Sequence, residues 1–126
     1  MKKTMSFFLL FSFLLSGCAS PNAIAYRSVS MQEAIAMMET EDNYILLDVR
    51  TKAEYASGHV PGALLLPNEE INGEPALLPD KNQRIFIYCR SGNRSKQAAR
   101  KLADLGYQNI VEFGGINSWP GEITKD

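Results

Sequence analysis

The stretch RIFIYCRSGNRSKQAARKLADLG, residues 84–106, decides the fold expected for this chain of 126 residues. RIFIYC is rich in β-branched and aromatic residues, which is typical of a strand buried on both faces. SKQAARKLADLG carries apolar residues at helical spacing and ends on Gly106, which predicts an amphipathic helix. A strand joined by a short loop to a helix is the repeating unit of α/β proteins.

The preceding residues contain two recognisable helix starts. Ser30 and Glu33 form a capping-box pattern, and Thr51 and Glu54 form a second one that opens a short helix ending at Gly58. Further strands are expected at residues 44–49, 63–66 and 109–113. We therefore expect one α/β domain with a central parallel sheet and helices on both faces.

The loop after the strand RIFIYC is the candidate site, because ligands collect at the carboxyl ends of parallel strands. Gly92 can adopt a positive φ and Asn93 tolerates one, so the chain can curl there and turn backbone N–H groups inward. Cys89 would lie at the base of this curl, facing the start of the helix. Five basic residues crowd the same region: Arg90, Arg94, Lys96, Arg100 and Lys101.

These surroundings predict a reactive cysteine. A helix N-terminus and nearby cations lower thiol pKa values from about 8.5, so Cys89 should be largely thiolate at neutral pH. A buried cysteine that acts only as a small hydrophobe is the plainer alternative. Arg90 and Arg94 favour the reactive interpretation, because they lie inside the loop and not on a solvated helix face.

Three blocks of the sequence resemble the signatures of single-domain rhodaneses, a family of sulfurtransferases. LLDVRTKAEYASGHVPGA (residues 46–63) resembles the amino-terminal signature, IYCRSGNRS (residues 87–95) the active-site loop, and GGINSWPG (residues 114–121) the carboxy-terminal signature. The resemblance implies a rhodanese-like domain over residues 26–126 and a catalytic Cys89 that becomes a persulfide. It implies a donor such as thiosulfate, an acceptor such as cyanide or a thiol, and no cofactor or metal.

The resemblance also implies roles for other residues of these blocks. The loop would hold the anionic donor and stabilise departing sulfite, as preorganised donors do in oxyanion sites. Its substrate-binding residues would be Arg90, Ser91, Gly92, Asn93, Arg94 and Ser95. The structural residues near the site would be Asp48, Arg50, Glu54, His59, Gly114, Gly115 and Trp119.

The structural residues have specific expected contacts. Asp48 and Arg50 end a strand and Glu54 follows in the short helix, so an ion pair is expected to brace the strand end against that helix. His59 is expected to make a core hydrogen bond and not to act as a base. The wall beside the active loop is expected to consist of Gly114, Gly115 and Trp119.

Two other functions stay open. A cysteine-dependent phosphatase or arsenate reductase also uses a thiolate in a cationic loop, but tyrosine phosphatases have His-Cys, five residues and then arginine. Here Tyr88 precedes Cys89, and four residues separate Cys89 from Arg94. This shorter loop suits a sulfane sulfur better than a phosphate. A persulfide carrier or binding module that serves one protein partner without turnover would have the same sequence.

The first residues indicate export. Two lysines precede FFLLFSFLL (residues 7–15), an apolar run too short to span a bilayer. LSGC (residues 15–18) resembles the lipobox of bacterial lipoprotein signal peptides. The resemblance implies removal of residues 1–17, a lipid on Cys18 and a linker over residues 18–25. The domain would then be anchored to a bacterial membrane, facing the periplasm or the cell exterior.

The charge of the remaining chain disfavours nucleic acid as a partner. Two of the 13 Lys and Arg residues and none of the 14 Asp and Glu residues lie in residues 1–17, which leaves a net charge of −3. Cys18 and Cys89 are the only cysteines. With Cys18 lipidated, Cys89 has no disulfide partner, and a free thiol in an exported protein indicates reactivity.

Overall fold

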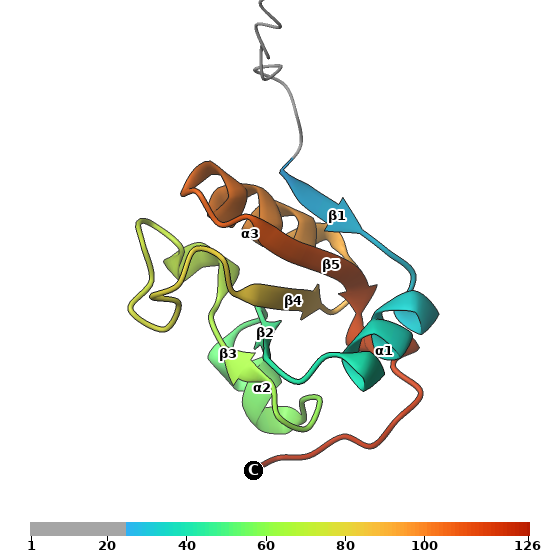
Figure 1. The fold of residues 1–126 in the computed structure, drawn as a ribbon. Helices are drawn as coiled ribbons and strands as arrows, with labels where there is room; N and C mark the ends of the chain where they lie inside the picture. Colours follow the sequence, from blue (N-terminus) through green and yellow to red (C-terminus); the bar gives the residue numbers. More distant parts are fainter. Residues whose placement is uncertain (1–24) are drawn as a thin grey trace, which may run out of the picture.

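The computed structural model describes residues 25–126, so the expected signal peptide, the lipidated Cys18 and nearly all of the linker lie outside the described residues. Five parallel strands form one sheet (Figure 1). In spatial order they are β1 (Tyr26–Ser28), β5 (Asn109–Gly115), β4 (Arg84–Cys89), β2 (Tyr44–Asp48) and β3 (Leu64–Leu65). The strand RIFIYC is therefore the central one.

Helices cover both faces of the sheet, which confirms the predicted α/β architecture (Figure 1). Three α-helices and two short 3₁₀ turns occur in residues 25–126: α1 (Met31–Thr40), α2 (Lys52–Ser57), η1 (Asn68–Glu70), α3 (Asn93–Asp104) and η2 (Ile116–Ser118). Side chains of α1 and α2 pack on one face, and those of α3 pack on the other. Within the described part of the chain, no helix is long and apolar enough to cross a membrane.

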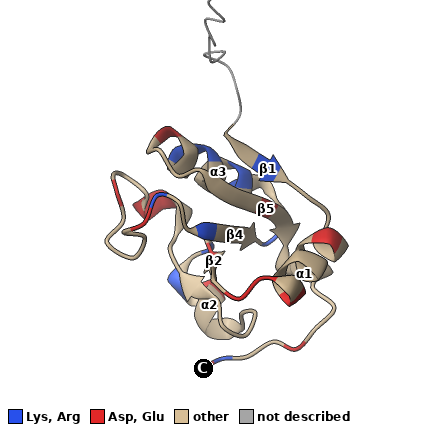
Figure 2. Ribbon diagram, in the orientation of Figure 1, with Lys and Arg blue, Asp and Glu red and all other residues tan. Residues whose placement is uncertain are grey.

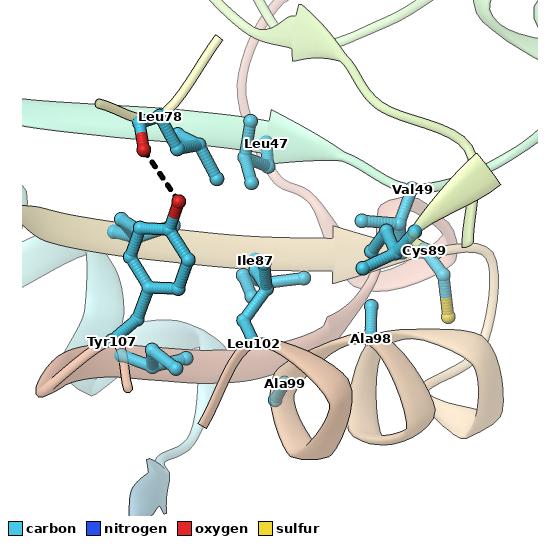
Figure 3. Packing of buried hydrophobic residues seen from close by; sticks show 12 residues of the cluster. Leu47, Val49, Leu78, Ile87, Cys89, Ala98, Ala99, Leu102 and Tyr107 are labelled. Atoms are coloured by element: carbon cyan, nitrogen blue, oxygen red, sulfur yellow. Dashed lines mark hydrogen bonds between the residues drawn. The ribbon is translucent and has the colours of Figure 1, made fainter. Parts of the chain in front are cut away.

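β4 divides the core into two layers. Ile85, Ile87 and Cys89 face the layer under α3, whereas Phe86 and Tyr88 face the layer under α1, as the two-residue period of a strand requires. All five side chains are buried. Figure 3 shows that Cys89 lies at the end of the first layer, beside the start of α3.

The two predicted capping boxes differ in the structure. At α2 the Thr51 hydroxyl accepts from the Glu54 N–H at 3.2 Å, and Glu54 in turn accepts from the Thr51 N–H at 3.3 Å. At α1 Ser30 accepts from the Glu33 N–H at 3.1 Å. The Glu33 carboxylate pairs with Arg27 at 2.6 Å, so the reciprocal half of this box is absent.

The sheet has two features that the sequence does not predict. β1 is only three residues long, and no alternation can be recognised in so short a segment. β5 continues two residues further than expected and contains a bulge, because Ile87 pairs with Glu112 whereas Cys89 pairs with Gly115. One extra residue of β5 therefore lies opposite the end of β4, and Gly114 in this bulge has a φ of 92°.

Candidate active site

The candidate site is the turn between β4 and α3. Gly92 has a φ of 117° in the left-handed region, and no side chain caps the helix that begins after it. The Gly92 N–H donates to the Cys89 sulfur at 3.0 Å. Asn93 is the first helical residue and does not share the positive φ, which only glycines adopt in residues 25–126. The open N-terminus of α3 thus directs backbone donors at the sulfur.

Hydrogen bonds decide the ionisation of Cys89. The side chain is 1% exposed, and its sulfur lies 3.4 Å from the Ser95 hydroxyl. Burial raises the pKa of Cys89, but hydrogen bonds with the Ser95 hydroxyl and with the backbone N–H groups of Ser95, Gly92 and Ser91 outweigh burial. The pKa therefore lies below that of an ordinary thiol, as predicted. These hydrogen bonds are the largest contributions in favour of the thiolate, rather than the arginine charges.

Arg94 is paired with Glu54 of α2. Its Nη1 and Nη2 atoms lie 2.6 Å and 3.0 Å from Oε1 and Oε2 of that carboxylate. The hydrogen bond from Arg94 is the largest cause that lowers the pKa of Glu54, to about 2, although burial opposes it. A cation expected to hold substrate therefore already has a carboxylate partner.

Arg50 pairs with Asp48, and the expected bracing of the strand end by Glu54 is not observed. Arg50 Nη2 lies 2.6 Å from Asp48 Oδ2 and donates to the Gly58 carbonyl oxygen at 2.7 Å. Arg50 thus reaches the C-terminal end of α2, while Glu54 turns toward α3. The Tyr88 hydroxyl donates to Asp48 Oδ2 at 2.8 Å, which completes a buried structural network.

Two glycines of β5 support the active loop, as predicted. A Cβ atom at Gly115 would overlap the Arg90 carbonyl oxygen, so only glycine fits there. A Cβ atom at Gly92 would lie 3.6 Å from Gly114 Cα, which shows how closely the loop approaches the bulge. The Arg90 carbonyl oxygen also accepts from the Asn117 N–H at 3.3 Å.

Trp119 is not part of this wall. Its indole packs against the opposite layer of the core and lines a hollow of about 410 Å³ together with Ile35 and Met38, because the η2 turn directs it toward α1. His59 is buried, and its Nδ1 lies 2.8 Å from the Tyr55 carbonyl oxygen. Its ring stacks on the Tyr55 ring at 3.6 Å, so it occupies the core position expected for it.

Glu112 of β5 lies beneath the loop and is not among the site residues predicted from the sequence. Its side chain is 1% exposed. Oε1 accepts from the Ser95 hydroxyl at 2.7 Å and from the Gly114 N–H at 2.8 Å, and Oε2 accepts from the Ser28 hydroxyl at 2.8 Å. The available signal is one acidic residue within the otherwise apolar strand segment IVEF.

Three more of the five predicted basic residues lie on α3 (Figure 2). Lys96 and Arg100 are exposed, whereas Lys101 donates to the Asn68 carbonyl oxygen at 2.7 Å. Arg90 is exposed as well, and it has no ion-pair partner among residues 25–126. The described residues contain no group of three or more His, Cys, Asp or Glu side chains that could hold a metal ion.

Comparison with known proteins extends this description. The Rhodanese-like domain family matches residues 30–122. A sulfurtransferase from Allochromatium vinosum is 42% identical over 93 residues, which cover 73% of this chain and 83% of the relative. Thiosulfate sulfurtransferase PspE from Escherichia coli is 37% identical over 71 residues, which cover 56% of this chain and 68% of the relative.

A third relative is longer than this chain. The putative sulfur carrier protein YrkF from Bacillus subtilis is 30% identical over 105 residues. The match covers 82% of this chain but only 56% of the relative.

Solved structures share the fold. A rhodanese-related protein from Thermoplasma volcanium has a TM-score of 0.67 at 26% identity, covering 80% of this chain and 100% of the other. A rhodanese with anions from E. coli has a TM-score of 0.60 at 32% identity, and the match covers 66% of this chain and 99% of the other. The chain therefore belongs to the Rhodanese-like domain family of sulfurtransferases.

Proposed function

We propose that the chain transfers a sulfane sulfur through a persulfide on Cys89, from a donor such as thiosulfate to a thiol or cyanide acceptor. The observation that carries the proposal is the Cys89 sulfur, buried against the open end of α3 with the Gly92 N–H at 3.0 Å. A thiolate stabilised by these donors is a competent nucleophile. The name of the PspE relative, a thiosulfate sulfurtransferase, supports the choice of donor.

The reaction has two balanced halves. The Cys89 thiolate attacks the outer sulfur of thiosulfate, a bond forms between the two sulfurs, and the sulfur–sulfur bond of thiosulfate breaks. Its electron pair leaves with sulfite, and the negative charge then lies on the terminal sulfur of the persulfide. In the second half, the acceptor's lone pair attacks that terminal sulfur, and the electron pair of the broken bond returns to Cys89. No external oxidant or reductant is needed.

The charges of the loop suit a small anionic donor. Thiosulfate is a dianion that a thiolate repels, and Arg90 together with the loop N–H groups offsets this repulsion. Arg94 contributes less, because Glu54 already accepts two of its hydrogen bonds. The same pairing weakens the case for a phosphatase, since it occupies two of the five N–H donors of Arg94 and offsets its charge.

Mass spectrometry of the purified full chain after incubation with thiosulfate tests the proposal. We expect Cys89 to gain one sulfur atom, and cyanide to remove it as thiocyanate over many turnovers. Cys89→Ser should fold normally and lose both properties. Thiosulfate turnover by Cys89→Ser would overturn the assignment. Loading of Cys89 without turnover would indicate a sulfur carrier and not an enzyme.

We also propose that a lipid on Cys18 anchors the domain to a bacterial membrane. The LSGC motif supports this location. Seven linker residues reach at most about 25 Å, so the active loop would work close to the lipid surface. The net charge of −3 disfavours contact with anionic headgroups, so the lipid would supply most of the attachment.

Cell fractionation tests the anchor. The wild-type protein should stay with membranes through a high-salt wash, whereas Cys18→Ala should lose lipidation and keep the chemistry at Cys89. Wild-type protein in the soluble fraction would show that LSGC is not a working lipobox.

A further inference from the structure

A buried carboxylate lies two hydrogen bonds away from the reactive sulfur. The Ser95 hydroxyl is 3.4 Å from the Cys89 sulfur and 2.7 Å from Glu112 Oε1. None of these three side chains is more than 1% exposed. Negative charges on both Cys89 and Glu112 would repel each other with little screening by water.

The Ser95 hydroxyl has one hydrogen and too many acceptors around it. Besides Glu112, the Gly92 carbonyl oxygen lies at 2.9 Å and the Gly114 carbonyl oxygen at 3.4 Å. If Ser95 donates to an ionised Glu112, the sulfur must supply the hydrogen of its own link, as a thiol. If Ser95 donates to a Cys89 thiolate, Glu112 must carry a hydrogen and donate it to Ser95.

We propose that Cys89 and Glu112 share one proton through the Ser95 hydroxyl, with Glu112 acting as a positioning residue for the thiolate. The thiol proton moves to Ser95 Oγ, and the original Ser95 proton moves to Glu112 Oε1. Two hydrogens and one negative charge are conserved, and each link holds one hydrogen before and after. The doubly ionised state leaves one link without a hydrogen, so a negative charge on Glu112 opposes a negative charge on Cys89.

This inference rests on the proposed function and deepens it. When a persulfide forms, the negative charge moves from Sγ of Cys89 to the terminal sulfur. Sγ then no longer needs the Ser95 hydrogen, which can return to Glu112. In the free enzyme one negative charge is therefore shared between Cys89 and Glu112, and in the loaded enzyme the Ser95 hydroxyl is released from the sulfur.

Both neutral and charged groups surround the pair. The Gly114 N–H and the Ser28 hydroxyl hold Glu112, each at 2.8 Å. The residues of α1 and η2 in the adjoining hollow of about 370 Å³ carry no charge: Met31, Gln32 and Ser118. Lys96 is the charged side chain that lines this hollow together with Glu112. Arg94 interacts electrostatically with Cys89, and its own acidic neighbours are its partner Glu54 and Glu69.

The pH dependence of Cys89 alkylation by iodoacetamide tests the coupling. The full chain is used with Cys18→Ala in every variant, so that Cys89 is its one thiol. Glu112→Gln removes the like charge at nearly constant shape, and it should lower the midpoint of thiolate formation by about one pH unit or more. Alkylation below the midpoint would then be about tenfold faster.

Two further variants complete the test. Ser95→Ala removes the hydroxyl donor and should raise the midpoint. Glu33→Gln is the matched control, because Glu33 is an exposed glutamate paired with Arg27, and its midpoint should not change.

An unchanged midpoint in folded Glu112→Gln would overturn the inference and leave Glu112 a purely structural group. Circular dichroism and thermal melting establish the fold of each variant. If Glu112→Gln does not fold, Ser95→Ala decides, and an unchanged midpoint there overturns the inference equally. Alkylation uses no sulfur donor, so this result is independent of whether the chain turns over thiosulfate.

Discussion

The turns after β2 and β4 lie at the same edge of the sheet, and each leads into a helix. They differ in whether side chains cap the N-terminus of that helix. At α2 the side chains of Thr51 and Glu54 satisfy the first N–H groups of the helix. At α3 no side chain caps the helix, and the Gly92 N–H donates to the sulfur of Cys89. A turn whose side chains cap the helix, as after β2, is a closed turn and has a structural role. A turn that leaves the first N–H groups of the helix uncapped, as after β4, is an open turn and attracts anionic groups.

Glu54 connects the two turns. It completes the capping box of α2 and also accepts two hydrogen bonds from Arg94 at the start of α3. The closed turn thereby neutralises one cation of the open turn. Arg90 is exposed and has no ion-pair partner among residues 25–126, so its charge is not neutralised in this way.

Gly92→Ala should have the largest effect on the open turn. Gly92 and Gly106 have φ values of 117° and 97°, and a Cβ atom in this region costs about 1–2 kcal/mol at either position. Only Gly92→Ala also disturbs the N–H that contacts Cys89, so kcat/KM for thiosulfate should fall at least about a hundredfold.

Gly106→Ala is the matched control for this prediction. It should lose similar stability in thermal unfolding and keep its kinetics within about twofold, since a Cβ atom at Gly106 has nothing within 4 Å. Equal kinetic losses in both variants would show that the open turn has no special role.

Arg90→Ala and Arg94→Ala should differ, although both residues lie in the loop. Arg90→Ala should raise the KM for thiosulfate about tenfold, as expected for one charge-assisted contact of about 1–3 kcal/mol. Arg94→Ala should raise it less, because Glu54 already pairs with that guanidinium. Steady-state kinetics with thiosulfate and with an uncharged donor measure this difference. A larger effect of Arg94→Ala would mean that the ion pair opens when the donor binds.

Glu54→Gln should have the smallest effect. It should change the free energy of unfolding and the way this free energy depends on pH. The pKa of Glu54 is lowered from 4.5 to about 2. The ionised carboxylate therefore stabilises the folded protein fully above pH 4.5, and this stabilisation is lost as the pH falls toward 2. At neutral pH the substitution should lower the free energy of unfolding by roughly 0.5–1 kcal/mol, because the ion pair of Glu54 and Arg94 is partly exposed. Denaturant unfolding should show the variant and the wild type converging near pH 2. A constant difference down to that pH would assign the effect to capping and not to charge.

The sequence alone determined the parts of this protein that depend on short-range interactions. The capping box of Thr51 and Glu54, the strand RIFIYC and the amphipathic helix after it all rest on contacts or periodicities within a few residues. The position of Cys89 between that strand and that helix follows from the same local patterns. The candidate nucleophile and its loop could therefore be identified before the structure was known.

Only the tertiary structure decided which groups surround that loop. Glu54 and Arg94 are 40 residues apart in sequence, and they meet because β2 pairs with β4 in a parallel register. Glu112 lies 17 residues beyond Ser95, and the extra residue in β5 brings Gly114 and Gly115 against the loop above it. Such partners depend on strand order, register and bulges, which are set by packing of the whole sheet and not by residues adjacent in the chain.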